Sequence, residues 1–177
     1  MIIAGERCRL RPYSIDEAPL LARLAGEFEV ARWMTATFPH PYRVDDARAW
    51  LARAVSDVPV NHFAIEVDGR LAGGAGLTPH DDERRGGAEF GYWLGPAFWG
   101  RGIATEAARL LAEHALTRRG LRRLAAHVFA RNLASARVLE KCGFVREAVL
   151  REAFVERDGT VSDGFLYARL RSPAGAP

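Results

Sequence analysis

Two glycines directly before an amphipathic segment are the clearest candidates for chemistry in this chain. Gly100 and Gly102 lie in the run Trp99–Thr105, and apolar residues recur at helical spacing from Ile103 onward. The first N–H groups of a helix have no intrahelical partner and lie at the positive end of its dipole. Because little side chain covers them here, they suit a phosphate or pyrophosphate. A tight turn that needs glycine only for steric reasons would explain the same residues.

The two best-known phosphate-binding loops do not fit this segment. A P-loop requires Gly-Lys-Ser/Thr, and the only lysine in the chain is Lys141. A dinucleotide fingerprint requires a third glycine where Thr105 stands. It also requires an acidic residue after the next strand, but that strand runs into Ala130-Arg131-Asn132. The pattern therefore indicates an anion-binding loop of another kind.

Glu89 is the candidate general base, on the strand that precedes the glycine loop. Strand alternation places Glu89, Gly91 and Trp93 on one face of residues 88–94. A carboxylate beside aromatic surface is expected to have a raised pKa, which suits proton abstraction. A solvated glutamate, or one paired with an arginine, is the alternative interpretation.

Asn132 and Ser135 open a short predicted helix further along the chain. Asparagine is among the best N-cap residues, so Asn132 has a structural explanation in any case. Ser135 is the third helical residue and lies on the same side, one turn on. His62, His80, His114 and His127 are dispersed and lack the spacing of a metal site, so we expect no bound metal.

The predicted elements run strand, two helices, three strands, helix, strand, helix and two strands. Their approximate ranges are 2–10, 14–27, 45–55, 63–67, 71–77, 88–94, 103–119, 124–129, 132–143, 149–156 and 161–170. The hairpins predicted at Asp68-Gly69 and Asp158-Gly159 make neighbouring strands antiparallel, whereas the central strand-helix-strand unit implies a parallel pair. This predicts an α+β fold with a mixed seven-stranded sheet and about four helices.

Length and composition bound the class of protein. The 177 residues carry a net charge of +3 and are 49% hydrophobic, which is typical of one soluble domain. We expect a single domain over 1–170 and a disordered tail over 171–177. Two cysteines are too few for a disulfide framework and favour the cytoplasm. No apolar run is long enough for a membrane span. The basic residues form no concentrated stripe, so nucleic acid is not the expected partner.

Two motifs together resemble the GNAT superfamily of N-acetyltransferases. The segment Gly102–Ala107, after an aromatic strand, is similar to the family's pyrophosphate loop for acetyl-CoA, and Asn132–Phe144 is similar to its second signature. The resemblance covers the whole succession of elements and favours the branch of ribosomal-protein N-terminal acetyltransferases (RimJ/RimL-like). Trp99 stands where many members have Gln or Arg, although the aromatic residue occurs in this branch.

The resemblance implies a cofactor site for acetyl-CoA. In this family the fourth and fifth strands separate, and the pantetheine arm lies between them. The resemblance implies that acetyl-CoA contacts the backbone of three strand residues, the glycine loop with the first helical residues after it, and the start of the later short helix. These residues are Tyr92, Trp93, Leu94, Trp99, Gly100, Arg101, Gly102, Ile103, Ala104, Thr105, Asn132 and Ser135.

The resemblance also assigns the catalytic residues of direct acetyl transfer to an amine. Glu89 would act as base, directly or through water. Many relatives protonate the thiolate with a tyrosine, but the matching position is Leu139, which leaves Ser135 as the available acid.

The acceptor and the assembly are less determined. The aromatic, proline-rich loop 32–43 predicts an acceptor wall that includes Trp33, Phe38 and Tyr42, although these residues could belong to the core. A peptide N-terminus or a small amine is the expected acceptor of a monomer or homodimer. A CoA-binding regulatory module without turnover is the alternative, and a nucleic-acid-binding domain is a third hypothesis.

Overall fold

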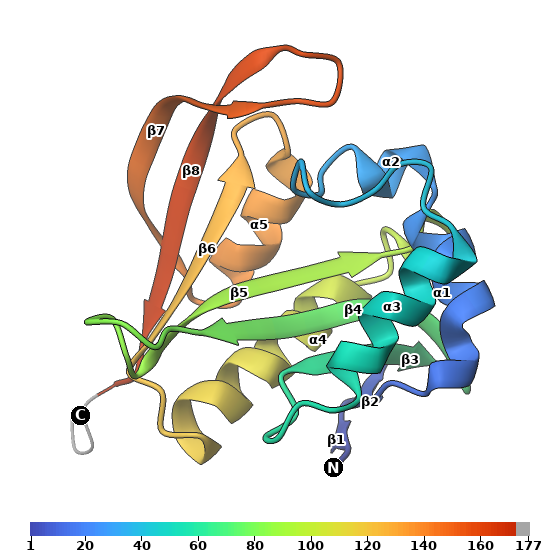
Figure 1. The fold of residues 1–177 in the computed structure, drawn as a ribbon. Helices are drawn as coiled ribbons and strands as arrows, with labels where there is room; N and C mark the ends of the chain where they lie inside the picture. The colour runs from blue at the N-terminus through green and yellow to red at the C-terminus, as the bar shows by residue number, and fades with distance from the viewer. Residues whose placement is uncertain (173–177) are drawn as a thin grey trace.

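The computed structural model describes residues 1–172, which form one mixed sheet with helices on both faces (Figure 1). The sheet order is β1-β2-β3-β4-β5-β6-β8-β7, and β5 and β6 form its one parallel pair among the described residues. The strands are β1 (Ile3–Ala4), β2 (Arg9–Pro12), β3 (His62–Val67), β4 (Arg70–Pro79), β5 (Gly87–Leu94), β6 (Arg123–Phe129), β7 (Val145–Val155) and β8 (Val161–Leu170).

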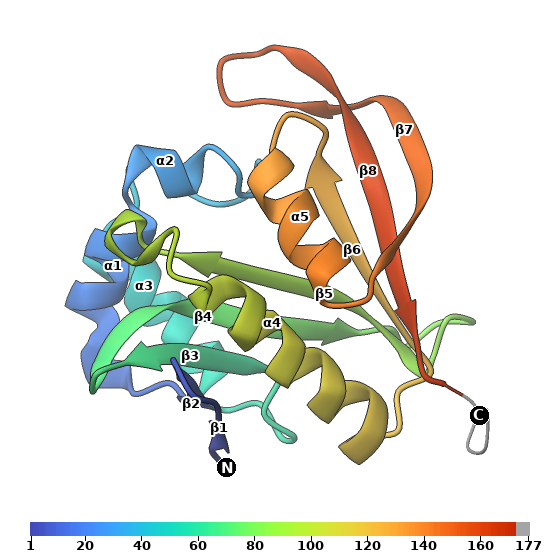
Figure 2. The same ribbon diagram turned by 180° about the vertical axis from the view of Figure 1, so that it is seen from behind.

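Two pairs of helices cover opposite faces of this sheet. Helices α4 and α5 lie behind the sheet in Figure 1 and in front of it in Figure 2, whereas α1 and α3 lie on the other side. The α-helices are α1 (Ala18–Ala25), α2 (Phe28–Ala31), α3 (Val44–Ala54), α4 (Ile103–Glu113) and α5 (Leu133–Lys141). A π-helical turn, His114–Arg118, extends α4 before Gly120 ends it with a positive φ of 69°.

Each pair of helices buries its own apolar cluster against the sheet. The larger cluster joins α4 and α5 to the sheet and includes Phe90, Ile103, Leu111, Leu124 and Leu139. The smaller cluster joins α1 and α3 to the opposite face. Alternation along β5 therefore separates its side chains, because Ala88, Phe90 and Leu94 enter the larger cluster while Trp93 packs against the smaller one.

The predicted fold class is confirmed, including the parallel pair at the centre and the Asp68-Gly69 and Asp158-Gly159 turns. The counts of seven strands and about four helices were each one too low. The strand predicted over residues 2–10 is two antiparallel strands, because the chain turns at Gly5, whose N–H donates to the Cys8 carbonyl over 2.9 Å. Helix α2 is a further short helix that follows α1 directly.

The predicted tail begins at Arg171. The Arg171 backbone N–H donates to the Arg122 carbonyl and its guanidinium to the Gly120 carbonyl, each over 3.0 Å. Residues 173–177 lie outside the described residues.

The start of α4 is tied to the turn between β1 and β2. The Glu106 carboxylate, in the first turn of the helix, accepts hydrogen bonds from the backbone N–H groups of Glu6 and Arg7, each over 2.7 Å. A carboxylate in this position also interacts favourably with the helix dipole. This contact fixes the first turn of α4, and with it the glycine loop that precedes the helix.

Replacing Glu106 by alanine should therefore lower the free energy of unfolding by about 1–2 kcal/mol, because two backbone donors lose a charged acceptor. Glu113→Ala removes an exposed carboxylate from the same helix and should change stability by less than about 0.5 kcal/mol. Urea denaturation of both variants measures the difference. Equal losses would show that the Glu106 contacts contribute nothing beyond helix propensity.

Candidate active site

The central feature of the site is the separation of β5 from β6. The two strands pair only at Gly87–Arg123, Ala88–Leu124 and Glu89–Ala125. Beyond Glu89, β5 stays with β4 as far as Leu94, whereas β6 stays with β8 along its whole length. Figure 1 shows the two strands diverging from this point. Among residues 1–172, the edge of β5 from Phe90 to Leu94 therefore has no strand partner on that side.

The glycine loop leaves the N-terminal end of α4 open. Gly100 and Gly102 have φ values of 72° and 75°, a region that favours glycine, so the steric explanation for these residues holds. A Cβ on Gly100 would have no atom within 4 Å, so the space beside it is open. The first helical bond runs from the Glu106 N–H to the Gly102 carbonyl, which leaves the N–H groups of Ile103–Thr105 without helical partners. The loop can therefore bind an anion as well.

Trp99 fixes this loop to the end of the preceding strand. Its indole N–H donates to the Leu94 carbonyl over 2.8 Å, although about half of the side chain is exposed. This bond occupies the Leu94 carbonyl, so a ligand cannot use that acceptor freely. Trp99 thus positions the glycine loop in addition to any contact that it makes with a ligand.

Arg7 adds a cation beside the loop that sequence reasoning did not identify. A Cβ on Gly102 would lie 3.6 Å from Arg7 Nε, which places this guanidinium next to the start of α4. The only sequence signal was its charge, because Arg7 lies about ninety positions before Gly102 and reaches it through the β1–β2 turn. Together with Arg101 on the loop itself, it makes this end of the molecule suitable for phosphate groups.

Helix α5 contributes its first turn to the separated edge of β5. Asn132 Oδ1 accepts a hydrogen bond from the Ser135 N–H over 3.2 Å, as expected of an N-cap. The Tyr92 hydroxyl lies 2.9 Å from Ser135 Oγ and 2.9 Å from the Ser135 carbonyl oxygen. The Ser135 carbonyl can only accept, so the Tyr92 hydroxyl donates its hydrogen to that carbonyl. In the same arrangement, Ser135 Oγ–H donates to the Tyr92 oxygen. Burial raises the pKa of Tyr92, which keeps that phenol protonated.

Glu89 lies where the strands separate, on the face of β5 opposite to Tyr92. Its Oε2 is 3.2 Å from His127 Nδ1 and its Oε1 is 3.6 Å from His80 Nε2. The side chain is 36% exposed. Its nearest polar partners are therefore two histidines. Neither the aromatic surface predicted beside Glu89 nor the arginine of the alternative interpretation supplies these contacts. The two histidines were dispersed in the sequence and meet here because β4 and β6 flank β5.

The loop 32–43 supplies aromatic side chains of two kinds. Trp33 packs on Phe129 at the end of β6, with ring centroids 5.9 Å apart, and Phe129 packs on Phe154 of β7 at 5.0 Å. Phe38 instead stacks on Tyr42 at 4.4 Å, and both contact the smaller apolar cluster. The structure therefore brings Trp33 to the end of β6, while Phe38 and Tyr42 are partly core residues.

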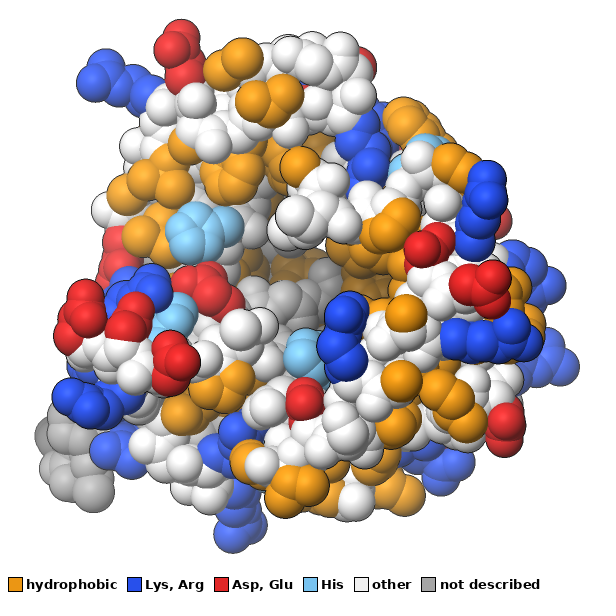
Figure 3. All heavy atoms as spheres, viewed as in Figure 1, with side chains coloured by type: hydrophobic (Ala, Val, Ile, Leu, Met, Phe, Trp, Pro, Cys, Tyr) orange, Lys and Arg blue, Asp and Glu red, His pale blue; other side chains and the backbone are white. Residues whose placement is uncertain are grey.

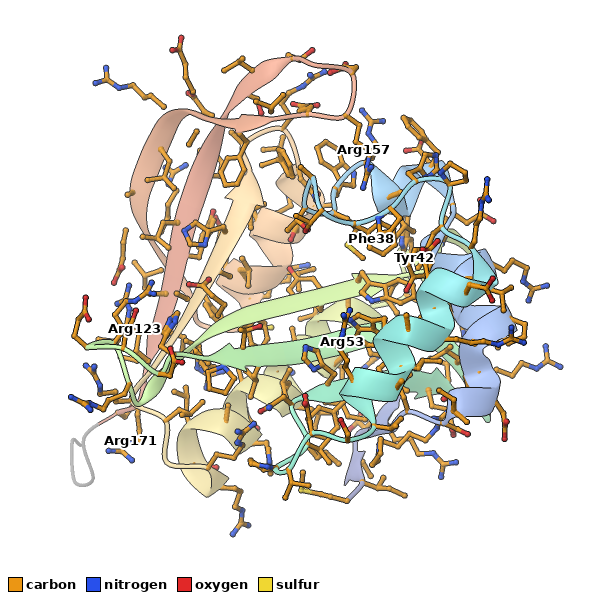
Figure 4. The ribbon with its side chains drawn as sticks, viewed as in Figure 1. Phe38, Tyr42, Arg53, Arg123, Arg157 and Arg171 are labelled. Atoms are coloured by element: carbon orange, nitrogen blue, oxygen red, sulfur yellow. The ribbon has the colours of Figure 1, made fainter. Side chains whose placement is uncertain are left out.

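Arg157 connects this loop to the turn between β7 and β8. Its guanidinium donates to the carbonyls of Ala31 over 2.6 Å and Phe38 over 2.8 Å, and Figure 4 shows it directed at this loop from the β7–β8 turn. Figure 3 shows a hollow on this face of the molecule, between the side of β6, β7 and β8 and the side of α1 and α3. The Arg157 contact links the β7–β8 turn to the loop 32–43.

A protein-family model described as an acetyltransferase (GNAT) domain matches residues 7–145. The chain belongs to the GNAT acetyltransferase family. It is therefore an acyltransferase, and the predicted family and its acetyl-CoA donor are confirmed. Residues 1–172 contain no group of three or more His, Cys, Asp or Glu side chains arranged to hold a metal ion. None of the described helices has the length and apolar character needed to cross a membrane.

Three similar proteins illustrate the family. The uncharacterized N-acetyltransferase p20 of Bacillus licheniformis is 30% identical over 174 residues, or 94% of each chain. The spermidine N(1)-acetyltransferase of Escherichia coli K12 is 28% identical, over 82% of this chain and 77% of that protein. The structure of Mycobacterium smegmatis RimJ in complex with CoA-disulfide matches with a TM-score of 0.80 and 27% identity, over 96% of this chain and 84% of RimJ.

Acetyl-CoA at about a hundred times its dissociation constant should stabilise the wild-type fold by roughly 2.7 kcal/mol. Gly102→Ala should reduce this stabilisation, because a methyl group beside the start of α4 crowds the anion. Gly69→Ala is the matched control: Gly69 has the same φ of 75° and open surroundings, but lies in the β3–β4 turn.

Both variants should lose similar intrinsic stability, about 1–2 kcal/mol, from the strained backbone. Thermal denaturation with and without acetyl-CoA separates this loss from the effect on binding. A full acetyl-CoA response in Gly102→Ala would contradict the assignment of this loop to the donor.

Proposed function

We propose that this enzyme acetylates a primary amine by direct transfer, with a protein or peptide N-terminus or a small-molecule amine as acceptor. The observation that carries the proposal is the separation of β5 from β6 at Glu89. It leaves a free strand edge leading to the glycine loop, and it puts a carboxylate at the point where that edge begins. The RimJ structure in complex with CoA-disulfide supports the donor, and the spermidine acetyltransferase supports a small amine as one of the two acceptor classes.

The donor's phosphates would be bound at the start of α4. The N–H groups of Ile103, Ala104 and Thr105 supply donors there, with Arg101 and Arg7 as neighbouring cations. The free edge of β5 at Tyr92 and Trp93 would bind amide groups of the pantetheine arm, and Asn132 would hold the start of α5 beside it. When bound, acetyl-CoA supplies an acetyl group activated as a thioester.

Two residues of this chain would move protons. An alkyl amine is mostly protonated near neutral pH, so a base must remove a proton before it can react. We place this base at Glu89, which is exposed at the separation of the strands. Ser135 would donate a proton to the departing thiolate from the opposite face of β5. Its hydroxyl lies within hydrogen-bond distance of Tyr92, which can resupply that proton.

The acceptor would lie in the hollow on the face that carries Glu89. Trp33, Phe129 and Phe154 are half-buried aromatic side chains on this side, and they come from three different segments. Phe38 and Tyr42 would shape the hollow from beneath, through their packing with the smaller cluster. Burial raises the pKa of Tyr42 to about 12, so it remains a neutral phenol in this wall.

The test of the proposed function is acetyl-CoA-dependent release of free thiol with a panel of peptides, polyamines, amino acids and aminoglycosides. Glu89→Gln should lower the turnover number by about 10²- to 10⁴-fold and leave acetyl-CoA affinity nearly unchanged, because only the base is lost. High pH should partly restore the rate, since the amine then loses its proton unaided. Wild-type binding of acetyl-CoA without release for any acceptor would instead indicate a regulatory module.

Trp33→Ala should raise the Michaelis constant for the amine more than that for acetyl-CoA, because Trp33 borders the acceptor side only. Phe28→Ala is the matched control, since Phe28 is an exposed aromatic residue of neighbouring α2 and is not part of the Trp33–Phe129–Phe154 contacts. Steady-state kinetics with each substrate varied in turn gives both constants. A similar change in both Michaelis constants would show that Trp33 has only a structural role.

A further inference from the structure

His127 forms a pair with Glu89 that the sequence motifs do not include. Its Nδ1 lies 3.2 Å from Glu89 Oε2, within hydrogen-bond distance. An ionised carboxylate has no proton to give, so the hydrogen in this bond belongs to the imidazole. In the neutral ring, that assignment places the single N–H on Nδ1 and leaves a lone pair on Nε2. The carboxylate thus sets the tautomer and orients the ring, as the acid of a catalytic triad does.

The unprotonated nitrogen is free to act on a ligand. Among residues 1–172, no protein group hydrogen-bonds His127 Nε2, and the side chain is 42% exposed. His127 lies two residues beyond Ala125, the last residue of β6 that pairs with β5. The side chains of Glu89, Ala125 and His127 therefore share one face, and His127 stands on the far side of the opening from β5.

The second histidine at Glu89 has a different environment. His80 follows β4, and its Nε2 lies 3.6 Å from Glu89 Oε1, beyond the range of a good hydrogen bond. Only 12% of its side chain is exposed, compared with 42% for His127. The charged groups nearby are also paired: Arg84 contacts Asp82 over 2.7 Å and Arg123 contacts Glu147 over 2.5 Å. His127 is therefore the histidine of this cluster that can meet an acceptor.

We propose that His127 Nε2 receives the proton from the acceptor amine, and that Glu89 positions the ring and stabilises the imidazolium that forms. This deepens the proposed function and rests on it, with His127 in place of Glu89 as the group that takes the proton. The ammonium group gives one proton to Nε2, the C–N bond then forms as the C–S bond breaks, and the imidazolium releases its proton to water. The acetylated nitrogen loses its second proton to water, and the departing thiolate gains one from Ser135. Free imidazole has a pKa of about 6.5 and free glutamate about 4.3, so an imidazole is the better match to an alkyl ammonium at neutral pH.

The experiment compares histidine variants in the thiol-release assay across pH, with acetyl-CoA saturating. His127→Gln should lower the turnover number about 100-fold near neutral pH, and high pH should partly restore the rate, because the amine then loses its proton without the imidazole. His62→Gln is the matched control, since His62 Nδ1 contacts Asp57 over a similar 3.1 Å but lies on β3, away from the separation. It should keep the wild-type rate and pH profile.

Chemical rescue distinguishes a base from a structural residue. His127→Ala should regain part of its rate when free imidazole is added, whereas Glu89→Gln should not. A His127→Gln variant with nearly wild-type turnover and pH profile would overturn the proposal and leave Glu89 as the base itself. A large loss of turnover in His80→Gln but not in His127→Gln would overturn it as well. A wild-type enzyme inactive towards every acceptor would instead refute the proposed function.

Discussion

The three-residue parallel contact between β5 and β6 is the constraint on which the rest of this structure depends. Each strand is paired on its other side, β5 with β4 from Ala88 to Leu94 and β6 with β8 over its whole length. Their common contact ends at Glu89, so the sheet opens without either strand losing its partner. The unpaired edge of β5 would be costly if it were buried without hydrogen bonds, which is a physical reason for a ligand to lie along it.

The two faces of the sheet carry different groups around this opening. On one face, α4 and α5 bury the larger apolar cluster and bring the glycine loop and Ser135 to the edge of β5. On the other face, the partly exposed side chains of Glu89 and His127 contact each other where β5 and β6 separate. The donor and the acceptor can therefore approach the same strand from opposite sides.

The segments that border the site are held mainly by side-chain-to-backbone contacts. Glu106 holds the β1–β2 turn against α4, Trp99 holds the glycine loop against β5, and Arg157 holds the loop 32–43 against the β7–β8 turn. In each contact, a donor or acceptor with fixed geometry binds a main-chain group. Such contacts position the backbone of irregular segments, which lack the regular hydrogen bonds of a sheet or a helix.

The sequence by itself determined the local features of this protein. Hydrophobic period, turn residues and caps predicted the order of the elements, the Asp68-Gly69 and Asp158-Gly159 hairpins and the start of α5 at Asn132, because these depend on residues close together in the chain. The glycine loop was also predicted locally, from a bare helix start. The family resemblance of two short motifs then supplied the donor and the chemistry, which no local pattern specifies.

The tertiary structure alone decided which distant side chains meet. His80, Glu89 and His127 come from three segments and converge only because β4, β5 and β6 are adjacent in the sheet. Arg7 reaches Gly102 through a turn that sequence periodicity treated as one continuous strand. Trp33 and Phe38 belong to one loop, yet one contacts the end of β6 and the other the core. Strand adjacency and loop packing depend on the whole fold, so no pattern within a short window encodes them.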